Sequence, residues 1–389
     1  MRVAHLSLTD FRNYESAELD LEPGPNLFVG SNGQGKTNLV EALGYLSTLG
    51  SHRVSSDHAM IRSGRDSAIV RARLAHGDST VLAEVQLNRV GVNRAQVNRS
   101  PIKTRELPRY FSSVLFAPED LALVRGEPSG RRRFLDELLV LRTPRLAGVL
   151  ADYDRVLRQR NSLLKSARAS GVRGQLSTLD IWDERLVALG AEIIRARAEL
   201  IDRLTPEVET AYTAIAGRQQ AAALASRLSI LAPGRDDDDL DSAESTEGRL
   251  AAEDIAPAFR AALTRIRRTE LERGITLVGP HRDDLLLTLN GLPARGYASH
   301  GESWSFALSL KLASAEVLRR ESITGDPVLI LDDVFAELDE SRRGRLADAV
   351  EGFEQVLITA AVRNDVPDRL AGHVVLIRAG RIVEGDENG

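Results

Sequence analysis

Apolar and polar residues alternate over much of the N-terminal part of the chain, which is typical of strands with one buried face. Helical spacing first appears after a glycine-rich segment, where Leu39, Val40, Leu43 and Leu46 fall on one face. The pattern predicts strands at Val3–Leu8, Asn26–Val29, Ala68–Leu74, Val81–Leu87 and Val92–Val97, and a helix at Lys36–Leu49.

The character changes near Pro118, after which the chain is helical and rich in charge. Leu146–Ala169 and Leu176–Ala216 carry apolar residues at three- and four-residue spacing, and Gly171–Gly174 separates them. The pattern predicts an antiparallel helical hairpin or lever. Ordinary packing with a solvated face explains such helices more simply than a dedicated binding surface does.

Strands and helices alternate again in the C-terminal third. The predicted helices are Ala251–Arg273, Glu302–Arg320 and Ser341–Val350, and the predicted strands are Leu285–Leu289, Val328–Leu331, Val356–Thr359 and Val374–Ile377. Asn290-Gly291 is a hairpin-turn signal. The acidic, serine-rich stretch near 235–248 buries little apolar surface and is predicted to be a disordered loop.

This order predicts an α/β head built from both ends of the chain. The glycine-rich segment near residue 30 and the buried strand near residue 330 must share one sheet if both serve one nucleotide. We therefore predict a head at 1–118 and 259–389, interrupted by an inserted helical lever domain at 119–258.

Composition narrows the class of protein. The chain has no cysteine, which excludes disulfides and thiolate metal sites, and it has no apolar run long enough to span a membrane. No signal-peptide pattern follows Met1, so we expect a cytoplasmic protein. Its formal net charge is −5, so any DNA binding must come from a local basic face.

Such a face is available between Arg125 and Arg173, where twelve Lys or Arg face five Asp or Glu, a local excess of +7. The candidate DNA-binding residues are Arg131, Arg132, Arg133, Arg158 and Arg160. An alternative is that Arg132 and Arg133 pair with Asp136 and Glu137 on the same helix.

The glycine-rich segment between the first buried strand and the first helix carries the clearest chemistry. Gly30, Ser31, Asn32, Gly33, Gln34, Gly35, Lys36 and Thr37 match G-x-x-x-x-G-K-T, the phosphate-binding P-loop. Its glycines let backbone N–H groups surround phosphates, and the helix N-terminus adds positive potential. Lys36 would reach the β- and γ-phosphates of ATP, and Thr37 would ligate Mg²⁺.

The buried strand Val328–Leu331 is followed by Asp332 and Asp333. Carboxylates at the C-terminal end of a parallel strand suit a metal–phosphate site. Asp332 would hold Mg²⁺ directly or through water, and Asp333 would orient or deprotonate the attacking water. A strand that merely ends in a polar turn is the alternative.

Ala298–Glu302 opens a predicted helix, where the Ser299 hydroxyl and the Gly301 N–H could bind an anion. The alternative is an ordinary capping box, with Ser299 as the cap and Glu302 three residues later. His281, in the polar cluster Gly279–Asp284, could sense phosphate, although a surface turn explains it equally well.

Taken together, these motifs resemble the RecF family, the bacterial recombination-mediator ATPases related to SMC and ABC heads. The resemblance covers essentially the full length. Its carriers are Leu8–Tyr14, Gly30–Thr37, Ser51–Arg53, Pro118–Leu121, Arg131–Asp136, Gly279–Asp284, Ala298–Glu302, Asp332-Asp333 and Glu337–Asp339.

The resemblance implies an ABC-type head with an inserted lever, which forms a homodimer on ATP. Ser299 and Gly301 of one copy would contact the phosphate held by Lys36 of the other. The resemblance also implies slow ATP hydrolysis and binding of DNA at gaps or single-strand/duplex junctions. It further implies work with RecR and RecO in RecA loading, and support of the SOS response.

Three features depart from the pattern of related heads. His300 and Glu302 replace residues that are commonly Gly or Gln, Asp333 stands where many heads have Glu, and no Gln clearly serves as the Q-loop. A transport ATPase or another P-loop subunit without a DNA role is the rival function. A structural ATP-binding scaffold that does not hydrolyse ATP is a third possibility.

Overall fold

The computed structural model describes residues 1–170, 176–217, 220–232, 250–322 and 325–383. The predicted acidic loop near 235–248 and the turn at Gly171–Gly174 both lie outside these described residues. Within the described chain, no helix is both long and apolar enough to cross a membrane.

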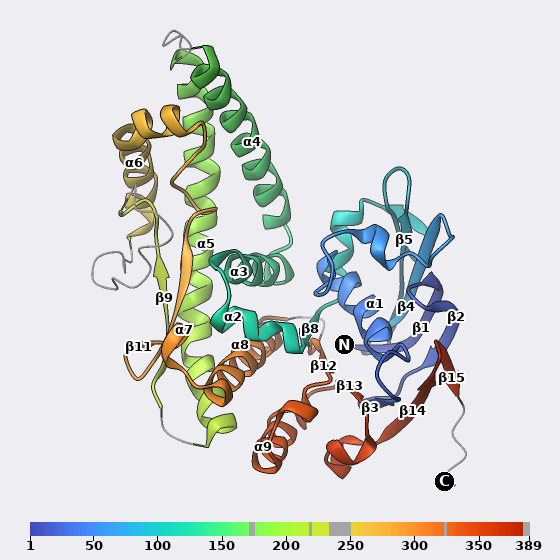
Figure 1. The fold of residues 1–389 in the computed structure, drawn as a ribbon. Helices are drawn as coiled ribbons and strands as arrows, with labels where there is room; N and C mark the ends of the chain where they lie inside the picture. Colours follow the sequence, from blue (N-terminus) through green and yellow to red (C-terminus); the bar gives the residue numbers. More distant parts are fainter. Residues whose placement is uncertain (171–175, 218–219, 233–249, 323–324, 384–389) are drawn as a thin grey trace. The chain divides into compact units, whose positions relative to one another are not determined.

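The chain divides into two compact units. Unit 1 comprises Met1–Val124, Glu207–Gln220 and Ser299–Gly389, and unit 2 comprises Arg125–Pro206 and Ala221–Ala298. Figure 1 colours the chain by residue number and labels its elements.

Unit 1 contains two sheets. The antiparallel sheet has the order β2-β1-β4-β5-β6-β7, with strands β1 Arg2–Phe11, β2 Tyr14–Asp20, β4 Ser67–His76, β5 Ser79–Asn88, β6 Arg94–Val97 and β7 Ser100–Ile102. The second sheet has the order β15-β14-β3-β13-β12-β8, with strands β3 Gly24–Val29, β8 Ser113–Phe116, β12 Val328–Asp332, β13 Gln355–Ala360, β14 His373–Arg378 and β15 Arg381–Val383. All of its pairings are parallel except β14 with β15.

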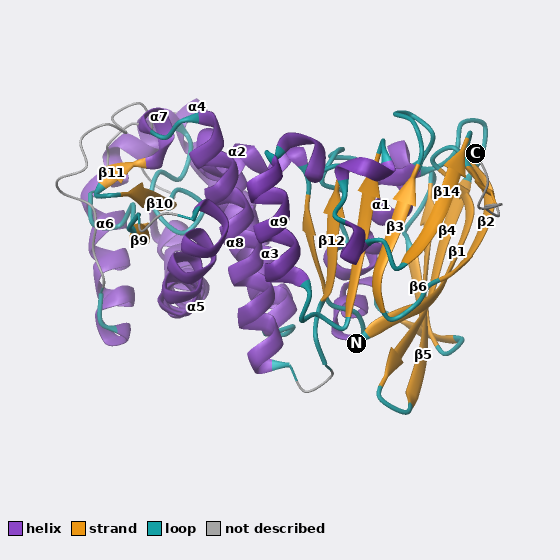
Figure 2. Ribbon diagram, turned by 90° about the horizontal axis from the view of Figure 1, so that it is seen from below, coloured by secondary structure: helices purple, strands orange, loops and turns teal. Residues whose placement is uncertain are grey.

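The main core of unit 1 lies around helix α1 Lys36–Thr48, between the two sheets (Figure 2). Leu39, Val40, Leu43 and Leu46 are buried there against side chains of both sheets, as their helical spacing predicted. Unit 1 also contains helices α8 His300–Glu321 and α9 Glu340–Val350, nearly all of α2 Leu121–Arg125, and the end of α5. The pairing of β3, β13 and β12 confirms that the glycine-rich segment and the acidic strand belong to one sheet.

Unit 2 is mainly helical. It contains α3 Pro128–Arg142, α4 Leu146–Ser170, α6 Ala252–Arg273 and most of α5 Leu176–Ala216. A small sheet, β9 Ala222–Arg227, β10 Asp284–Leu289 and β11 Leu292–Pro293, leads into α7 Ala294–Tyr297. Figure 1 shows α4 and α5 side by side, and Arg160 of α4 donates to Asp183 of α5, as a helical hairpin requires.

The units differ from the predicted domain boundaries. Residues 259–298, predicted to return to the head, cluster with unit 2, whereas Glu207–Gln220, which includes the end of α5, clusters with unit 1. The reason is a shared core: Phe259 and Val278 are buried with Tyr153 of α4 and Leu186 of α5. The sequence pattern identified the elements but not which core each element joins.

Candidate nucleotide site

The P-loop lies between β3 and α1, as predicted. Gly33 and Gly35 have φ of +81° and +119°, which favours glycine. An added Cβ at Gly35 would stand 2.9 Å from the Tyr14 hydroxyl, so this position also lacks room for a side chain. Gly35 is the N-cap of α1, which directs the first N–H groups of the helix toward the loop.

Two turns from distant parts of the sequence hold the loop from outside. Asn13 Nδ2 donates to Gln34 O at 3.1 Å, and the Tyr14 hydroxyl donates to Gly35 O at 3.2 Å. On the other side, Ala379 N donates to Gln34 Oε1 and Gly380 N donates to Gln34 O. These contacts occupy the outward-facing groups of Gln34, so the loop has a fixed conformation before any ligand binds.

The Lys36 side chain is only 3% exposed, and among the residues that the structure describes its ammonium group has partners only at 3.5 Å and beyond. Nζ lies 3.5 Å from Ser31 O and 3.9 Å from Asp333 Oδ1. A buried ammonium group without a close anion is electrostatically costly. The geometry therefore favours an anionic ligand inside the loop.

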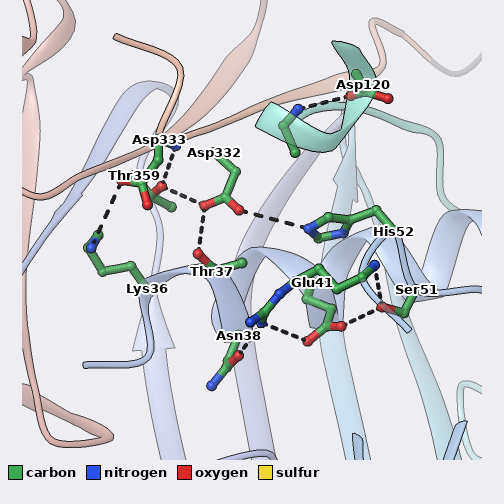
Figure 3. Close-up of polar contacts among 12 residues, drawn as sticks. Lys36, Thr37, Asn38, Glu41, Ser51, His52, Asp120, Asp332, Asp333 and Thr359 are labelled. Carbon is green, nitrogen blue, oxygen red and sulfur yellow. Dashed lines mark hydrogen bonds and ion pairs between the residues drawn. The ribbon is translucent and has the colours of Figure 1, made fainter. Parts of the chain in front are cut away.

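Asp332 lies at the centre of the second half of the site (Figure 3). Its Oδ1 accepts from Thr37 Oγ1 at 3.0 Å and from Thr359 Oγ1 at 2.6 Å. The same Thr359 oxygen accepts from the backbone N–H of Asp333 at 2.9 Å. Strands β12 and β13 and helix α1 thus bring these groups together, as the parallel register requires.

Burial raises the pKa of Asp332 to about 6, and the neighbouring Asp333 adds to this shift while the two threonine hydroxyls oppose it. A buried carboxylate beside a threonine hydroxyl is a donor set of hard oxygens, which fits Mg²⁺. Asp333 itself is 32% exposed and has a φ of +52°, so its carboxylate faces the open side of the site.

A neighbouring network that the sequence analysis did not assemble surrounds Glu41 of α1. Arg12 donates to both of its carboxylate oxygens and Ser51 donates to one of them. Burial alone would raise the pKa of Glu41, but these hydrogen bonds and the two nearby arginines lower it overall. Arg53 joins the network through Asn38 Oδ1 at 3.0 Å. In the sequence Glu41 shares its helix face with Thr37, Asn38 and Thr48, so the pattern gave no signal of this network.

His52 lies against Asp332, with Nε2 3.8 Å from Oδ2. Burial lowers the pKa of His52, and three nearby carboxylates only partly oppose this. Its Nε2 is one of the described buried atoms without a hydrogen-bond partner. The imidazole is therefore a neutral neighbour of the acidic strand, close enough to contact a bound metal–phosphate group.

Ser299 and Glu302 form the capping box that the sequence offered as an alternative. Ser299 Oγ accepts from Glu302 N at 3.3 Å, and Ser299 N donates to Glu302 Oε2 at 2.8 Å. Glu302 also accepts from Gln220 Nε2 at 3.2 Å. The Glu302 carboxylate thus stabilises the helix terminus. Trp304 donates to His300 Nε2, so a neutral His300 carries its proton on Nδ1.

The Gly279–Asp284 cluster belongs to unit 2, not to the P-loop unit, and it is structural. Tyr153 Oη lies 2.8 Å from His281 Nδ1, and burial lowers the pKa of His281 to about 3. His281 is partly buried, and its hydrogen-bond partners Tyr153 and Thr276 belong to unit 2. These contacts favour a structural role, and the suggestion that His281 senses phosphate stays a prediction.

Two of the five arginines predicted to bind DNA are buried. Arg131 donates to both oxygens of Asp284, and Arg160 is fully buried between Asp183 and Glu270. Both residues hold the unit together and cannot form a DNA face in this conformation. Arg132 donates to the Asp283 carbonyl, which differs from the same-helix pairing considered above. Arg133 and Arg158 are exposed, and Arg158 pairs with Asp154.

Comparison with known proteins agrees with this arrangement. A family model described as the RecF/RecN/SMC N-terminal domain matches residues 2–374. A relative from Clavibacter sepedonicus, named "DNA replication and repair protein RecF", is 68% identical over 388 residues, which span 99% of this chain and 95% of the relative.

Two solved structures extend the comparison. One, of the recombination mediator protein RecF-ATPrS in the RecFOR pathway, has a TM-score of 0.85 at 30% identity and covers 98% of this chain and 97% of its own. A crystal structure of an SmcHead bound to the C-winged helix domain of ScpA has a TM-score of 0.54 at 14% identity, over 98% of this chain and 97% of its own, and shares the fold. The fold is that of an ABC/SMC-type head, and the chain belongs to the RecF/RecN/SMC N-terminal domain family.

Proposed function

We propose that this chain is an ATP-binding, slowly hydrolysing protein of DNA replication and recombinational repair. The observation that carries the proposal is the meeting of Lys36, Thr37 and Asp332 at one sheet edge. Family membership supports it, since similar chains are named DNA replication and repair proteins and one was solved with ATPrS.

Each residue of the site has a role in this proposal. The backbone N–H groups of Gly30–Thr37 hold the phosphates, and Lys36 neutralises the β- and γ-phosphates. Thr37 and Asp332 would hold Mg²⁺, which supplies charge neutralisation when bound. Asp333 is the catalytic carboxylate that orients or deprotonates the attacking water. Its exposed position beside Lys36 supports that role.

The proposal includes a homodimer that assembles on ATP. Ser299 and Gly301 at the N-terminus of α8 would contact the phosphate held by Lys36 of a second copy. The Ser299 side chain and its helix end are exposed, which leaves them accessible to such a partner. Two bridging nucleotides provide the differential affinity that a two-state clamp needs.

The DNA part of the proposal rests on the family and on the exposed arginines. The dimer would clamp gapped or junction DNA and aid RecA loading with RecR and RecO, in support of the SOS response. Arg133 and Arg158 remain the candidate phosphate contacts, whereas Arg131 and Arg160 are withdrawn because they are buried.

Sedimentation of the full chain with and without ATP tests this function. Wild-type protein should dimerise on ATP, and Lys36→Met should remain monomeric because the loop loses its cation. Arg369→Ala, which removes a partly exposed arginine paired with Asp348, is the matched control. Normal ATP-dependent dimers of Lys36→Met would contradict the mechanism.

The rival function, a transport or other P-loop ATPase subunit, makes a different prediction. A clamp on DNA should hydrolyse ATP faster with gapped DNA at low salt, whereas a transport subunit should not respond to DNA. An ATP turnover that gapped DNA leaves unchanged would favour the rival.

A further inference from the structure

The guanidinium group of Arg342 lies against the first turn of α8. A Cβ added to Gly301 would stand 2.8 Å from Nη1 and 3.0 Å from Nη2 of Arg342. Gly301 has no positive φ that would require glycine. The absence of a side chain at position 301 is therefore what lets a cation approach the helix end this closely.

Asp339 fixes Arg342 in this position. As the N-cap of α9, Asp339 accepts from Arg342 N at 2.9 Å through Oδ1, and its Oδ2 lies 3.2 Å from Nη1 of the same residue. The Arg342 side chain stays 27% exposed. One carboxylate thus sets both the backbone and the guanidinium of Arg342, while the guanidinium remains accessible from outside.

This placement puts a cation beside the positive end of a helix, with Asp339 as its counterion. The N-terminus of a helix carries partial positive charge, so a cation beside it is unfavourable unless an anion is shared. Glu302 already caps Ser299 N and accepts from Gln220, and Asp339 already caps α9. The Ser299 hydroxyl, the first-turn N–H groups of α8 and Arg342 together form a concentration of donors that suits a multiply charged anion.

The next residue shows what a purely structural arginine looks like here. Arg343 donates through Nε to the carbonyl oxygens of Phe335 and Leu338, and its Nη2 pairs with Asp365 at 3.1 Å. Its guanidinium is used within its own subunit. Arg342 has a single carboxylate partner among the contacts described, and that partner also serves as a helix cap.

We propose that Arg342 contacts the terminal phosphate of the nucleotide held by Lys36 of a second copy, and so completes the inter-subunit half of the site. This inference rests on the proposed ATP-dependent dimer and adds to it a cation that acts in trans. Arg342 takes up the charge of the phosphate while Ser299 and the backbone of Gly301 orient it. The sequence motif at Ala298–Glu302 contains no Lys or Arg that could do this.

The direct test uses the full chain and the Arg342→Ala variant. Loss of one charge-assisted contact per bridge should reduce ATP turnover and ATP-dependent dimerisation roughly 10- to 100-fold, while monomers bind a fluorescent ATP analogue as before. Arg342→Lys should recover part of the dimerisation, and Arg369→Ala should behave as wild type. Unchanged turnover and dimerisation, or an equal loss of nucleotide affinity in the monomer, would overturn the proposal.

Mixing two variants separates action in trans from action in cis. Lys36→Met and Arg342→Ala, each tagged differently, should form few homodimers with ATP. A mixed dimer has one intact site, with Lys36 from one copy and Arg342 from the other, so mixed dimers should form. Their absence would exclude Arg342 as a trans contact. If wild-type protein itself fails to dimerise on ATP, the proposed function fails first, which keeps the two failures distinct.

Discussion

Two Asp-Asp pairs in this chain have the same sequence and opposite uses. Asp332-Asp333 ends a buried strand of unit 1, and Asp283-Asp284 begins a strand of unit 2. In the first pair, the Asp333 side chain is 32% exposed and lies beside Lys36. In the second pair, the Asp284 side chain is 2% exposed and accepts from Nε and Nη2 of Arg131. Burial raises the pKa of Asp332 and of Asp283 to about 6 in each case.

The comparison teaches that a perturbed pKa alone does not identify a functional carboxylate. Asp283 Oδ1 accepts from the N–H and the hydroxyl of Ser229, and two arginines of its own unit lower its pKa, although Oδ2 has no hydrogen-bond partner among the described residues. Asp332 lies beside a threonine hydroxyl, an incompletely partnered lysine and an exposed second carboxylate. What distinguishes the Asp332-Asp333 pair is its position beside the P-loop, with Thr37 and Lys36 as neighbours.

The largest expected effect separates the pairs by activity. Asp333→Asn should reduce ATP turnover roughly 10²- to 10⁴-fold, because the general base or water-orienting carboxylate is lost. Asparagine tolerates the positive φ of this position, so thermal unfolding should stay close to that of wild type. Steady-state turnover and a melting curve measure both. Retained turnover would show that Asp333 is not the catalytic carboxylate, whereas absence of turnover in the wild type would leave the chain a structural scaffold that binds ATP without hydrolysing it.

Stability should show the opposite order. Asp284→Ala leaves the Arg131 guanidinium buried without its counterion, which should lower the free energy of unfolding by about 3–5 kcal/mol. The matched change Asp333→Ala should cost less than about 1 kcal/mol. Denaturant unfolding measures both. Replacing both partners, Arg131→Met with Asp284→Leu, should recover much of the loss, and equal losses in all variants would argue against a specific ion pair.

The pH dependence of stability should be the same for Asp332 and Asp283, the two carboxyl groups whose pKa is raised, when no ligand is added. A carboxyl whose folded pKa is about 6 and whose unfolded pKa is 3.8 binds its proton more tightly when folded. Its stabilisation is complete below about pH 4 and is lost as the pH rises through about 6. Asp332→Asn and Asp283→Asn should each therefore gain roughly 2–3 kcal/mol at pH 7.5 relative to pH 4.

Ligand should break this symmetry. With ATP and Mg²⁺ present, the ionised Asp332 of the wild-type protein should no longer be destabilising at pH 7.5, so Asp332→Asn should not be more stable than the wild type. Asp283→Asn should keep its gain in stability. Melting temperatures at both pH values, with and without ligand, measure this. A ligand effect of the same size on both variants would contradict the assignment of Asp332 to the metal site.

The smallest expected effect concerns two exposed arginines of unit 2, Arg133 and Arg158. Reversing exposed Arg133 and Arg158 to Glu should weaken DNA binding and reduce the salt slope by about one for each lost phosphate contact. Arg268→Glu, an exposed arginine on α6, should leave the slope unchanged. The salt dependence of binding to gapped DNA measures this, and an unaltered slope in the double variant would move the DNA face elsewhere.

Local pattern predicted the elements well. The strand, glycine-rich loop and helix at the start, and the buried strand before Asp332, lie where alternation and helical spacing placed them. Short strands without a clear pattern, such as β8 Ser113–Phe116 and β9 Ala222–Arg227, were not predicted. They form because a neighbouring strand provides partners for their backbone hydrogen bonds. The sequence of one segment does not indicate which strand will pair with it.

The sequence by itself determined the P-loop, the acidic strand and the capping box, because each depends on residues close together in the chain. Only the tertiary structure decided which arginines are buried, which Asp-Asp pair lies beside the P-loop, and that Arg342 lies against Gly301. Each of these depends on residues far apart in sequence, such as Arg131 with Asp284. Charge in the sequence is a property of one residue, whereas its use depends on the burial and counterions that folding supplies.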